Sequence, residues 1–220
     1  MSKKALIVWG GWDGHTPKPC ADLFAPVLKG EGYDVVVSNT LDSYTDEKLM
    51  GSVDLVVQIW TMGQISKEQR EGLDKAVRSG VGFAGFHGGI IDSFRTECRY
   101  QWMTGGQFVD HPGGCIPTQK IDIVDKKHPI TKGVDDFQIP NSEQYYCHVD
   151  PGVHVLCTTT FTGEHGDKAL YVAGTVMPYA WTRLWDKGRV FVAAWGHTHE
   201  DFKVPQALEI VKRGMMWATR

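Results

Sequence analysis

The sequence predicts an α/β protein with a doubly wound, mainly parallel sheet, helices on both faces and a less regular second half. Three observations indicate this class. Short apolar runs alternate with helical patterns over residues 4–86. The run at residues 53–60 is almost continuously hydrophobic, as parallel strands covered on both faces tend to be. A further strand ends in Gly85-Phe86-His87-Gly88-Gly89, which has the glycine pattern of a nucleophile elbow with His at the central position.

The first half is regular enough for each element to be placed. Strands are predicted at residues 4–9, 33–37, 53–60 and 81–86. A helix is expected at residues 21–29, because Leu23, Phe24 and Val27 have helical spacing and glycines follow. A second helix is expected to begin at Ser66, which Gln69 follows three residues later, as in a capping box.

The second half has shorter and less regular patterns. Strands are predicted at residues 120–124, 153–160, 169–172, 177–184 and 189–195. A turn is predicted at Asp186-Lys187-Gly188, and a closing helix at residues 204–218. The short connections suggest hairpins, so the sheet is expected to continue here. We predict one domain, residues 1–220.

Composition excludes several classes of function. A formal net charge of −3 and the lack of any basic run argue against nucleic acid as a partner. No apolar stretch is long enough to span a membrane, and no signal peptide is evident. The five cysteines are odd in number and form no C-x-x-C pair, which favours reduced thiols and a cytoplasmic protein.

Three predicted strands end close to both a glycine and a histidine. The three histidines are His15, His87 and His197. Because ligands of open α/β sheets bind outside the carboxyl ends of the strands, we expect the three side chains to meet at one edge. His111 and Glu143 lie in the long excursions between the elbow and the last strand, where a lid is expected. The sequence therefore predicts one site.

Several of these segments, in the same order, resemble the ThuA-like (trehalose utilisation) family. They are the elbow around His87, the segment Gly196-His197-Thr198-His199-Glu200, and His128-Pro129-Ile130-Thr131-Lys132-Gly133 before a Glu-x-Tyr element. The resemblance extends from the first strand to Glu200. It implies a flavodoxin-like sheet similar to that of class I glutamine amidotransferases, and a role in carbohydrate catabolism.

The likeness to amidotransferases also indicates what this chain does not do. Those enzymes carry Cys at the elbow, where this sequence has His87, although the segment at residues 196–200 resembles their His–Glu segment. An imidazole is a poor replacement for a thiolate that attacks a carboxamide. Glutaminase activity is therefore not expected.

Two kinds of chemistry remain open for the site. In the first, His87, Glu143 and His197 are general acid and base on a sugar or keto-sugar derivative, because an imidazole paired with a carboxylate can move protons near neutral pH. Other residues would bind this small carbohydrate: Trp9, Gly10, Gly11, His15, His111, Tyr145 and His199. A rim of tryptophans suited to stacking on a sugar ring is expected from Trp9, Trp12, Trp60 and Trp195.

In the second, histidines hold a divalent metal such as zinc, as in a zinc-dependent hydrolase. The candidate ligands are His15, His87, His111 and His197, with Glu143 beside them. A third alternative is a carbohydrate-binding or regulatory module without catalysis. A homo-oligomer is compatible with all three.

Overall fold

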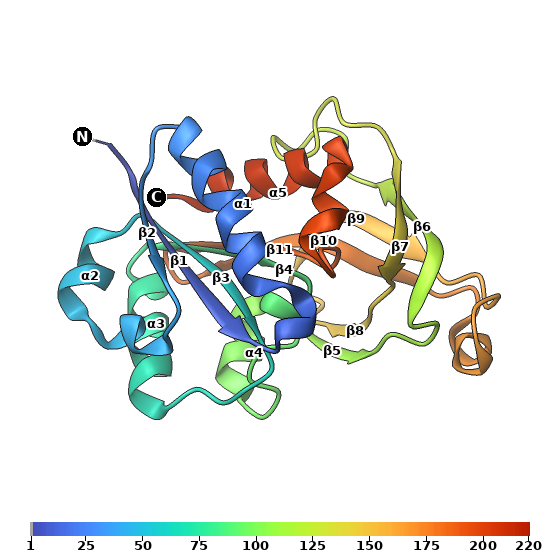
Figure 1. The fold of residues 1–220 in the computed structure, drawn as a ribbon, viewed down its shortest axis with the longest axis horizontal. Coiled ribbons are helices and arrows are strands. Elements are labelled where there is room, and N and C mark those ends of the chain that lie inside the picture. Colours follow the sequence, from blue (N-terminus) through green and yellow to red (C-terminus); the bar gives the residue numbers. More distant parts are fainter. Residues whose placement is uncertain (1) are drawn as a thin grey trace.

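A nine-stranded sheet runs through the computed structural model, which describes residues 2–220 (Figure 1). Its strand order is β2-β1-β3-β4-β11-β10-β9-β6-β7. The first five of these pair in parallel: β2 (Asp34–Ser38), β1 (Lys4–Gly11), β3 (Leu55–Thr61), β4 (Gly82–Phe86) and β11 (Gly188–Ala193). The carboxyl ends of these strands therefore lie at a common edge.

The remaining strands pair antiparallel and form a wing on the sheet. They are β10 (Val176–Trp185), β9 (His154–Thr160), β6 (Cys115–Ile123) and β7 (Phe137–Glu143). A separate two-stranded ribbon pairs β5 (Gly106–Asp110) with β8 (Tyr146–Val149). The wing begins where β11 pairs with β10, so it continues directly from the parallel part.

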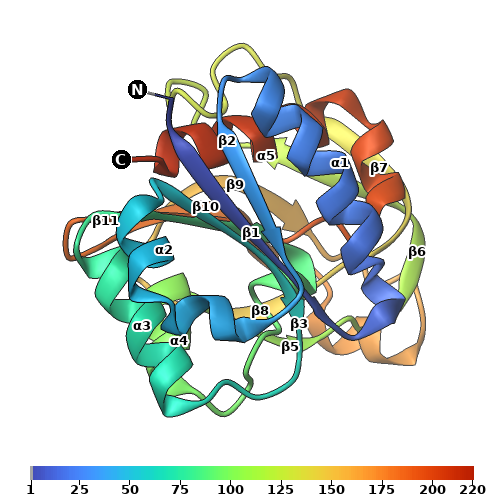
Figure 2. The same cartoon turned by 60° about the vertical axis from the view of Figure 1, so that its left-hand side comes forward.

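Helices cover both faces of the parallel part (Figures 1 and 2). One face carries α1 (Pro17–Gly30) and α5 (Pro205–Ala218), and the other carries α2 (Glu47–Ser52), α3 (Lys67–Arg78) and α4 (Cys98–Thr104). Short 3-10 helices are η1 (Asp13–His15), η2 (Leu41–Thr45), η3 (His87–Gly89), η4 (Asp167–Val172) and η5 (His199–Lys203). Within residues 2–220, none of the helices is long and apolar enough to cross a membrane.

The core lies between the parallel strands and these helices. Every residue of β4 is buried, because α5 packs against the strand and Tyr100 of α4 meets the Phe83 ring. Helix α5 approaches β11 closely at Gly214, where a Cβ would lie 2.3 Å from the Phe191 ring. Only a glycine lets the helix axis come this near the strand without moving that ring.

The predicted fold class is confirmed, with one local correction. The sheet combines parallel strands and flanking helices in the predicted order, and its irregular second half is the antiparallel wing. Residues 169–172 were expected to form a strand, but they belong to η4. Leu170 and Tyr171 are exposed there, 68% and 89%, so these two apolar side chains gain no burial that would favour an extended strand.

Candidate active site

His87 follows directly after β4 and has a strained backbone. Its φ of 48° lies in the left-handed region, which costs a residue with a Cβ on the order of 1–3 kcal/mol. The glycines around it allow the sharp turn to pack tightly: a Cβ on Gly88 would lie 2.4 Å from His15 Nδ1, and one on Gly89 would lie 2.9 Å from Ile59 Cα. The turn therefore has the close packing that the elbow pattern predicts.

The imidazole of His87 is held in a single orientation. Its Nδ1 lies 2.9 Å from the backbone oxygen of Ala194, and it must donate there because a carbonyl can only accept. The ring stacks on Tyr145, with centroids 3.7 Å apart. The side chain is only 1% exposed. Burial, opposed in part by the hydrogen bond that a protonated ring would donate to Glu143, lowers the pKa of His87 to about 3.

Four side chains from distant parts of the chain converge at this point. His15 comes from η1 after β1, His197 follows β11, and Glu143 is the last residue of β7. One Glu143 oxygen, Oε2, lies 3.1 Å from His87 Nε2, 3.2 Å from His197 Nδ1 and 3.6 Å from His15 Nε2. We call His15, His87, Glu143 and His197 the histidine–glutamate cluster.

The second oxygen of Glu143 faces a different histidine. Oε1 lies 3.6 Å from His111 Nε2, and the His111 side chain is 40% exposed whereas that of Glu143 is 10% exposed. Burial would raise the pKa of Glu143, but the contacts with His15, His197 and His87 outweigh it and hold that pKa well below its usual range. Glu143 is therefore an ionised carboxylate with a buried side and a more open side.

Two residues that the sequence did not single out position the histidines. Thr61, the last residue of β3, has its hydroxyl 2.9 Å from His15 Nδ1. Asp201 Oδ2 accepts hydrogen bonds from the backbone nitrogens of Gly196 and His197, each at 3.0 Å, and thereby fixes the turn that carries His197. The only sequence signal for Asp201 was its place directly after the Gly-His-Thr-x-Glu segment.

The other predicted site residues take different positions. His199 lies beside Thr16 and Glu200, with its Nδ1 3.2 Å from the Thr16 hydroxyl, and it is not part of the histidine–glutamate cluster. Tyr145 is 1% exposed, so the structure places it beneath His87 and not at an open surface. Residues 9–11 form the end of β1, where Gly10 and Gly11 pack against Trp60 and Thr61 and so shape the approach to η1.

The predicted tryptophan rim needs a correction. Trp195 is fully buried and donates its ring N–H to the Ala207 carbonyl, because β11 ends inside the core. Trp9 and Trp60 are partly buried against the core. Trp12 is 47% exposed and meets His15 edge-on, with ring centroids 4.7 Å apart. Of these four indoles, Trp12 is the one that combines exposure with contact to the cluster.

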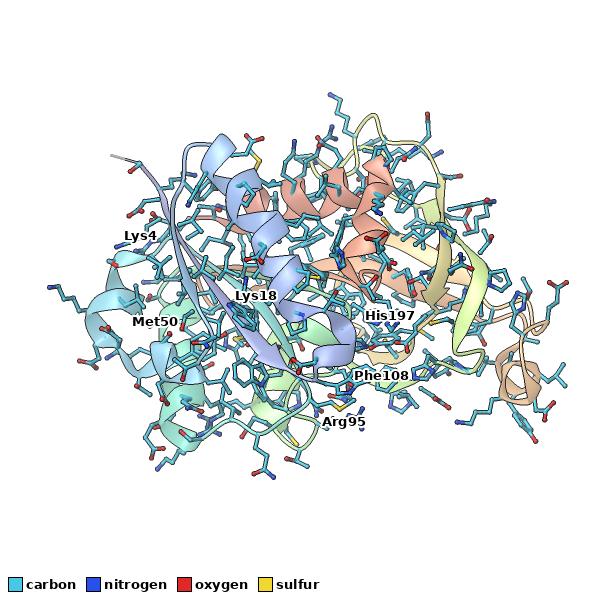
Figure 3. The ribbon with its side chains drawn as sticks, viewed as in Figure 1. Lys4, Lys18, Met50, Arg95, Phe108 and His197 are labelled. Atoms are coloured by element: carbon cyan, nitrogen blue, oxygen red, sulfur yellow. The ribbon has the colours of Figure 1, made fainter. Side chains whose placement is uncertain are left out.

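Aromatic and basic groups continue from the cluster along the β5–β8 ribbon. Phe108 packs on Tyr145 at 4.4 Å between ring centroids, and the Arg95 guanidinium lies over the Phe108 ring at 5.5 Å. Figure 3 shows Arg95, Phe108 and His197 in the same part of the molecule. Arg95 is held by a bidentate pair with buried Asp92, at 2.6 and 2.9 Å.

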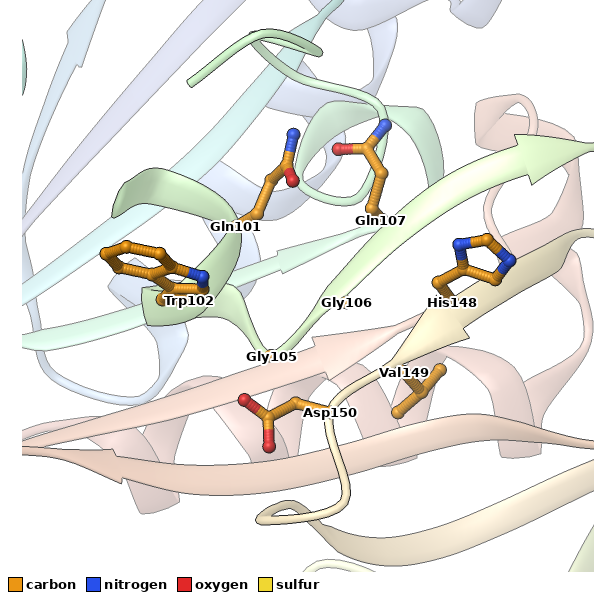
Figure 4. Close-up of a pocket in the computed structure, with 8 residues that line it drawn as sticks. All are labelled: Gln101, Trp102, Gly105, Gly106, Gln107, His148, Val149 and Asp150. Carbon is orange, nitrogen blue, oxygen red and sulfur yellow. The ribbon is translucent and has the colours of Figure 1, made fainter. Parts of the chain in front are cut away.

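A shallow pocket of about 240 Å³ lies away from the cluster (Figure 4). Gln107 and His148, paired across the ribbon, line it, whereas their neighbours Phe108 and Cys147 are not among its lining residues. Side chains alternate between the two faces of a strand, so the ribbon separates this pocket from Tyr145 and His87. None of the cluster residues lines it.

Comparison with known proteins assigns the family. A family model described as trehalose utilisation, ThuA, matches residues 4–218. A ThuA-like protein of Bacteroides uniformis is 17% identical, with a TM-score of 0.81 over 98% of this chain and 91% of that chain. A ThuA-like protein of Parabacteroides merdae is 16% identical, with a TM-score of 0.79 over 99% of this chain and 90% of that chain.

A cytoplasmic protein of Salmonella typhimurium shares the fold more distantly, at 13% identity and a TM-score of 0.64 over 99% of both chains. No curated protein matches the chain significantly. Identities this low show a common fold, whereas the family match spans nearly the whole chain. The protein therefore belongs to the ThuA family, which is described by the term trehalose utilisation.

Proposed function

We propose that this protein is an enzyme of carbohydrate catabolism that transfers protons on a sugar or keto-sugar derivative. The observation that carries the proposal is the environment of Glu143, an ionised carboxylate with three imidazoles around Oε2 and the more exposed His111 beside Oε1. A carboxylate that orients an imidazole at a cleft is a common arrangement for general acid–base catalysis. The family description supports a carbohydrate as the substrate class.

The roles within the site follow from exposure. The side chains of His87 and Glu143 are too buried to make extensive contact with a sugar. Their role is to place the negative charge and to orient the histidines around it. His111 is the histidine beside Glu143 that solvent reaches most, and its Nε2 can exchange a proton with a bound sugar. Trp12 offers an exposed ring face next to His15 on which a sugar ring can stack.

The state of the thiols also argues against glutamine hydrolysis. His87 stands where a nucleophilic Cys would be, and Cys115 is the cysteine paired in register with Glu143. Burial and the negative charge of Glu143 raise the pKa of Cys115, which is the reverse of what a reactive thiolate needs. Burial also raises the pKa of Cys20 to about 12.

The test follows proton exchange and does not require the product to be known. Trehalose, glucose and their keto derivatives are incubated with the protein in D₂O, and loss of carbon-bound protons is measured by NMR. We expect exchange at the carbon beside a carbonyl, slowed by about 10²–10⁴-fold in His111→Asn, the usual contribution of a positioned acid or base.

His148→Asn is the matched control, because His148 is exposed on β8 and lies outside the cluster. It should leave the exchange rate unchanged. If sugars bind but none undergoes exchange or turnover, the chain is a carbohydrate-binding module and the proposal is wrong.

A further inference from the structure

We infer that the histidine–glutamate cluster is a binding site for one divalent transition-metal ion. The candidate ligand atoms are Nε2 of His15 and His87, Nδ1 of His197 and a carboxylate oxygen of Glu143. These atoms all lie within 4.8 Å of one another, and the side chains are buried or nearly so. The inference concerns the same site as the proposed function and extends it, because a bound ion would supply Lewis acidity toward a sugar oxygen.

The hydrogen bonding of His87 shows which of its ring nitrogens is free to bind a cation. Nδ1 donates its hydrogen to the Ala194 carbonyl, so a neutral ring has only a lone pair at Nε2. That lone pair lies 3.1 Å from Oε2 of Glu143, which also has only lone pairs. Two acceptors at this distance repel each other unless a positive charge lies between them. The contact therefore requires either a proton or a metal cation.

The rest of the cluster favours a metal cation over a shared proton. The neutral rings of His15 and His197 could each donate an N–H to Oε2, but His15 Nε2 lies 3.6 Å away, beyond hydrogen-bond distance. Within residues 2–220, the buried His197 Nδ1 has no hydrogen-bond partner although it lies 3.2 Å from Oε2, so its direction does not suit a hydrogen bond. A metal ion can accept lone pairs from all four groups together.

The supporting hydrogen bonds match those of metal sites. Histidine ligands usually bond through their second ring nitrogen to a carbonyl, carboxylate or water, which fixes the tautomer and the ring. His87 does this with the Ala194 carbonyl, and His15 uses the Thr61 hydroxyl in a comparable way. In His87 the nitrogen that faces Glu143 is therefore left free for a ligand bond, and in His15 it is free when Nδ1 donates to the Thr61 hydroxyl.

The distances from Glu143 Oε2 to the three imidazole nitrogens are also close to those between ligands of one ion. Zinc binds nitrogen and oxygen at about 2.0–2.2 Å, so tetrahedral ligands lie about 3.4 Å apart. The contacts to Oε2 are 3.1, 3.2 and 3.6 Å. Ligands that are mostly imidazole suit zinc, iron, cobalt or nickel better than magnesium or calcium, which prefer oxygen. The ion would reach the site from the side of His197 and His111, whose side chains are 16% and 40% exposed.

The test is titration of metal-free protein with Zn²⁺ by calorimetry, with Co²⁺ absorption as a spectroscopic signature of the ligands. We expect one ion per chain. Glu143→Gln and His87→Gln should weaken binding by more than about a hundredfold, because even loss of a supporting hydrogen bond costs about 10–100-fold in affinity. Thr61→Val keeps the shape of Thr61 and removes only its hydroxyl, so it should weaken binding by about 10–100-fold and alter the Co²⁺ spectrum.

The matched control is His154→Asn, which removes an exposed histidine paired with Asp125 at 2.8 Å. It should bind one ion as tightly as the natural sequence does. Equal binding by Glu143→Gln and the natural protein, or no binding by the natural protein, would overturn the inference. Thr61→Val keeps the test valid if a cluster variant fails to fold.

The deuterium-exchange assay separates this inference from the proposed function. Sugar exchange by metal-free protein that fails to bind Zn²⁺ would overturn the metal site and leave the acid–base enzyme standing. Tight binding of one ion without exchange of any sugar would support the site and count against the proposed function.

Discussion

Gly88 is the residue that lets two of the converging histidines approach each other. A Cβ at this position would lie 2.4 Å from His15 Nδ1 and 3.0 Å from the Thr61 methyl group. Gly88→Ala should therefore push His15 off its hydrogen bond and reduce stability by about 1–3 kcal/mol, the usual cost of overpacking. Urea denaturation measures the loss of stability, and Zn²⁺ titration measures the displacement of His15.

Gly30→Ala is the control for this substitution. Gly30 ends α1, and nothing lies within 4 Å of where its Cβ would be. This Gly→Ala substitution should stabilise the protein by about 0.4–1 kcal/mol, because it restricts the unfolded chain without creating a clash. A Gly88→Ala variant as stable as Gly30→Ala would show that the His15 ring can move away at little cost.

At the scale of single residues, strand-end histidines were easier to find than the groups that support them. His15, His87 and His197 follow apolar runs beside glycines, and that pattern is visible in the sequence. Thr61 and Asp201 have ordinary neighbours, and only the fold brings them to His15 and His197. Whether Trp195 lies at a rim or in the core depends on how far β11 extends into the protein, which composition does not reveal.

Helix α5 illustrates how an element can affect the site without touching it. Its Gly214 packs against Phe191 of β11, and Ala194, which accepts the His87 hydrogen bond, follows that strand. Gly214→Ala should destabilise the protein by about 1–3 kcal/mol through overpacking, outweighing the gain of about 1 kcal/mol in helix propensity. The measurement is urea unfolding followed by circular dichroism.

Met216→Ala provides a control on the same helix. Met216 is 38% exposed, so its replacement should change stability by about 0.5 kcal/mol or less. A rise in stability in Gly214→Ala would mean that helix propensity dominates and that α5 has room to move away from β11.

At the scale of elements, burial decided which predictions succeeded. The strands of the parallel part centre on apolar runs, and their positions agree with the prediction within a few residues. The short apolar run at residues 169–172 looked like another strand, but Leu170 and Tyr171 are exposed and the run lies in η4. The ribbon strands β5 and β8 mix polar and apolar residues without a continuous apolar run, so the sequence does not identify them.

For the molecule as a whole, the regular alternation of strands and helices predicted the class of fold, and the family match agrees with it. The antiparallel wing was harder to place because hairpin strands carry no signal for their order in a sheet. That order matters for the site: it brings Glu143, at the end of β7, to histidines that follow parallel strands. The parallel part supplies the imidazoles, and the wing supplies the carboxylate.

This division of the cluster between two parts of the sheet has a consequence for folding kinetics. The contact between His87 and Glu143, which joins the two parts, spans 56 residues, and contacts between such distant segments form late because loop closure costs entropy first. During refolding from urea, the far-ultraviolet signal of helices and strands should recover before the visible absorption of bound Co²⁺. A cobalt signal that returned first would mean that the imidazoles and Glu143 meet before the sheet is complete. In the expected order, the colour of the metal reports when the wing has docked onto the parallel strands.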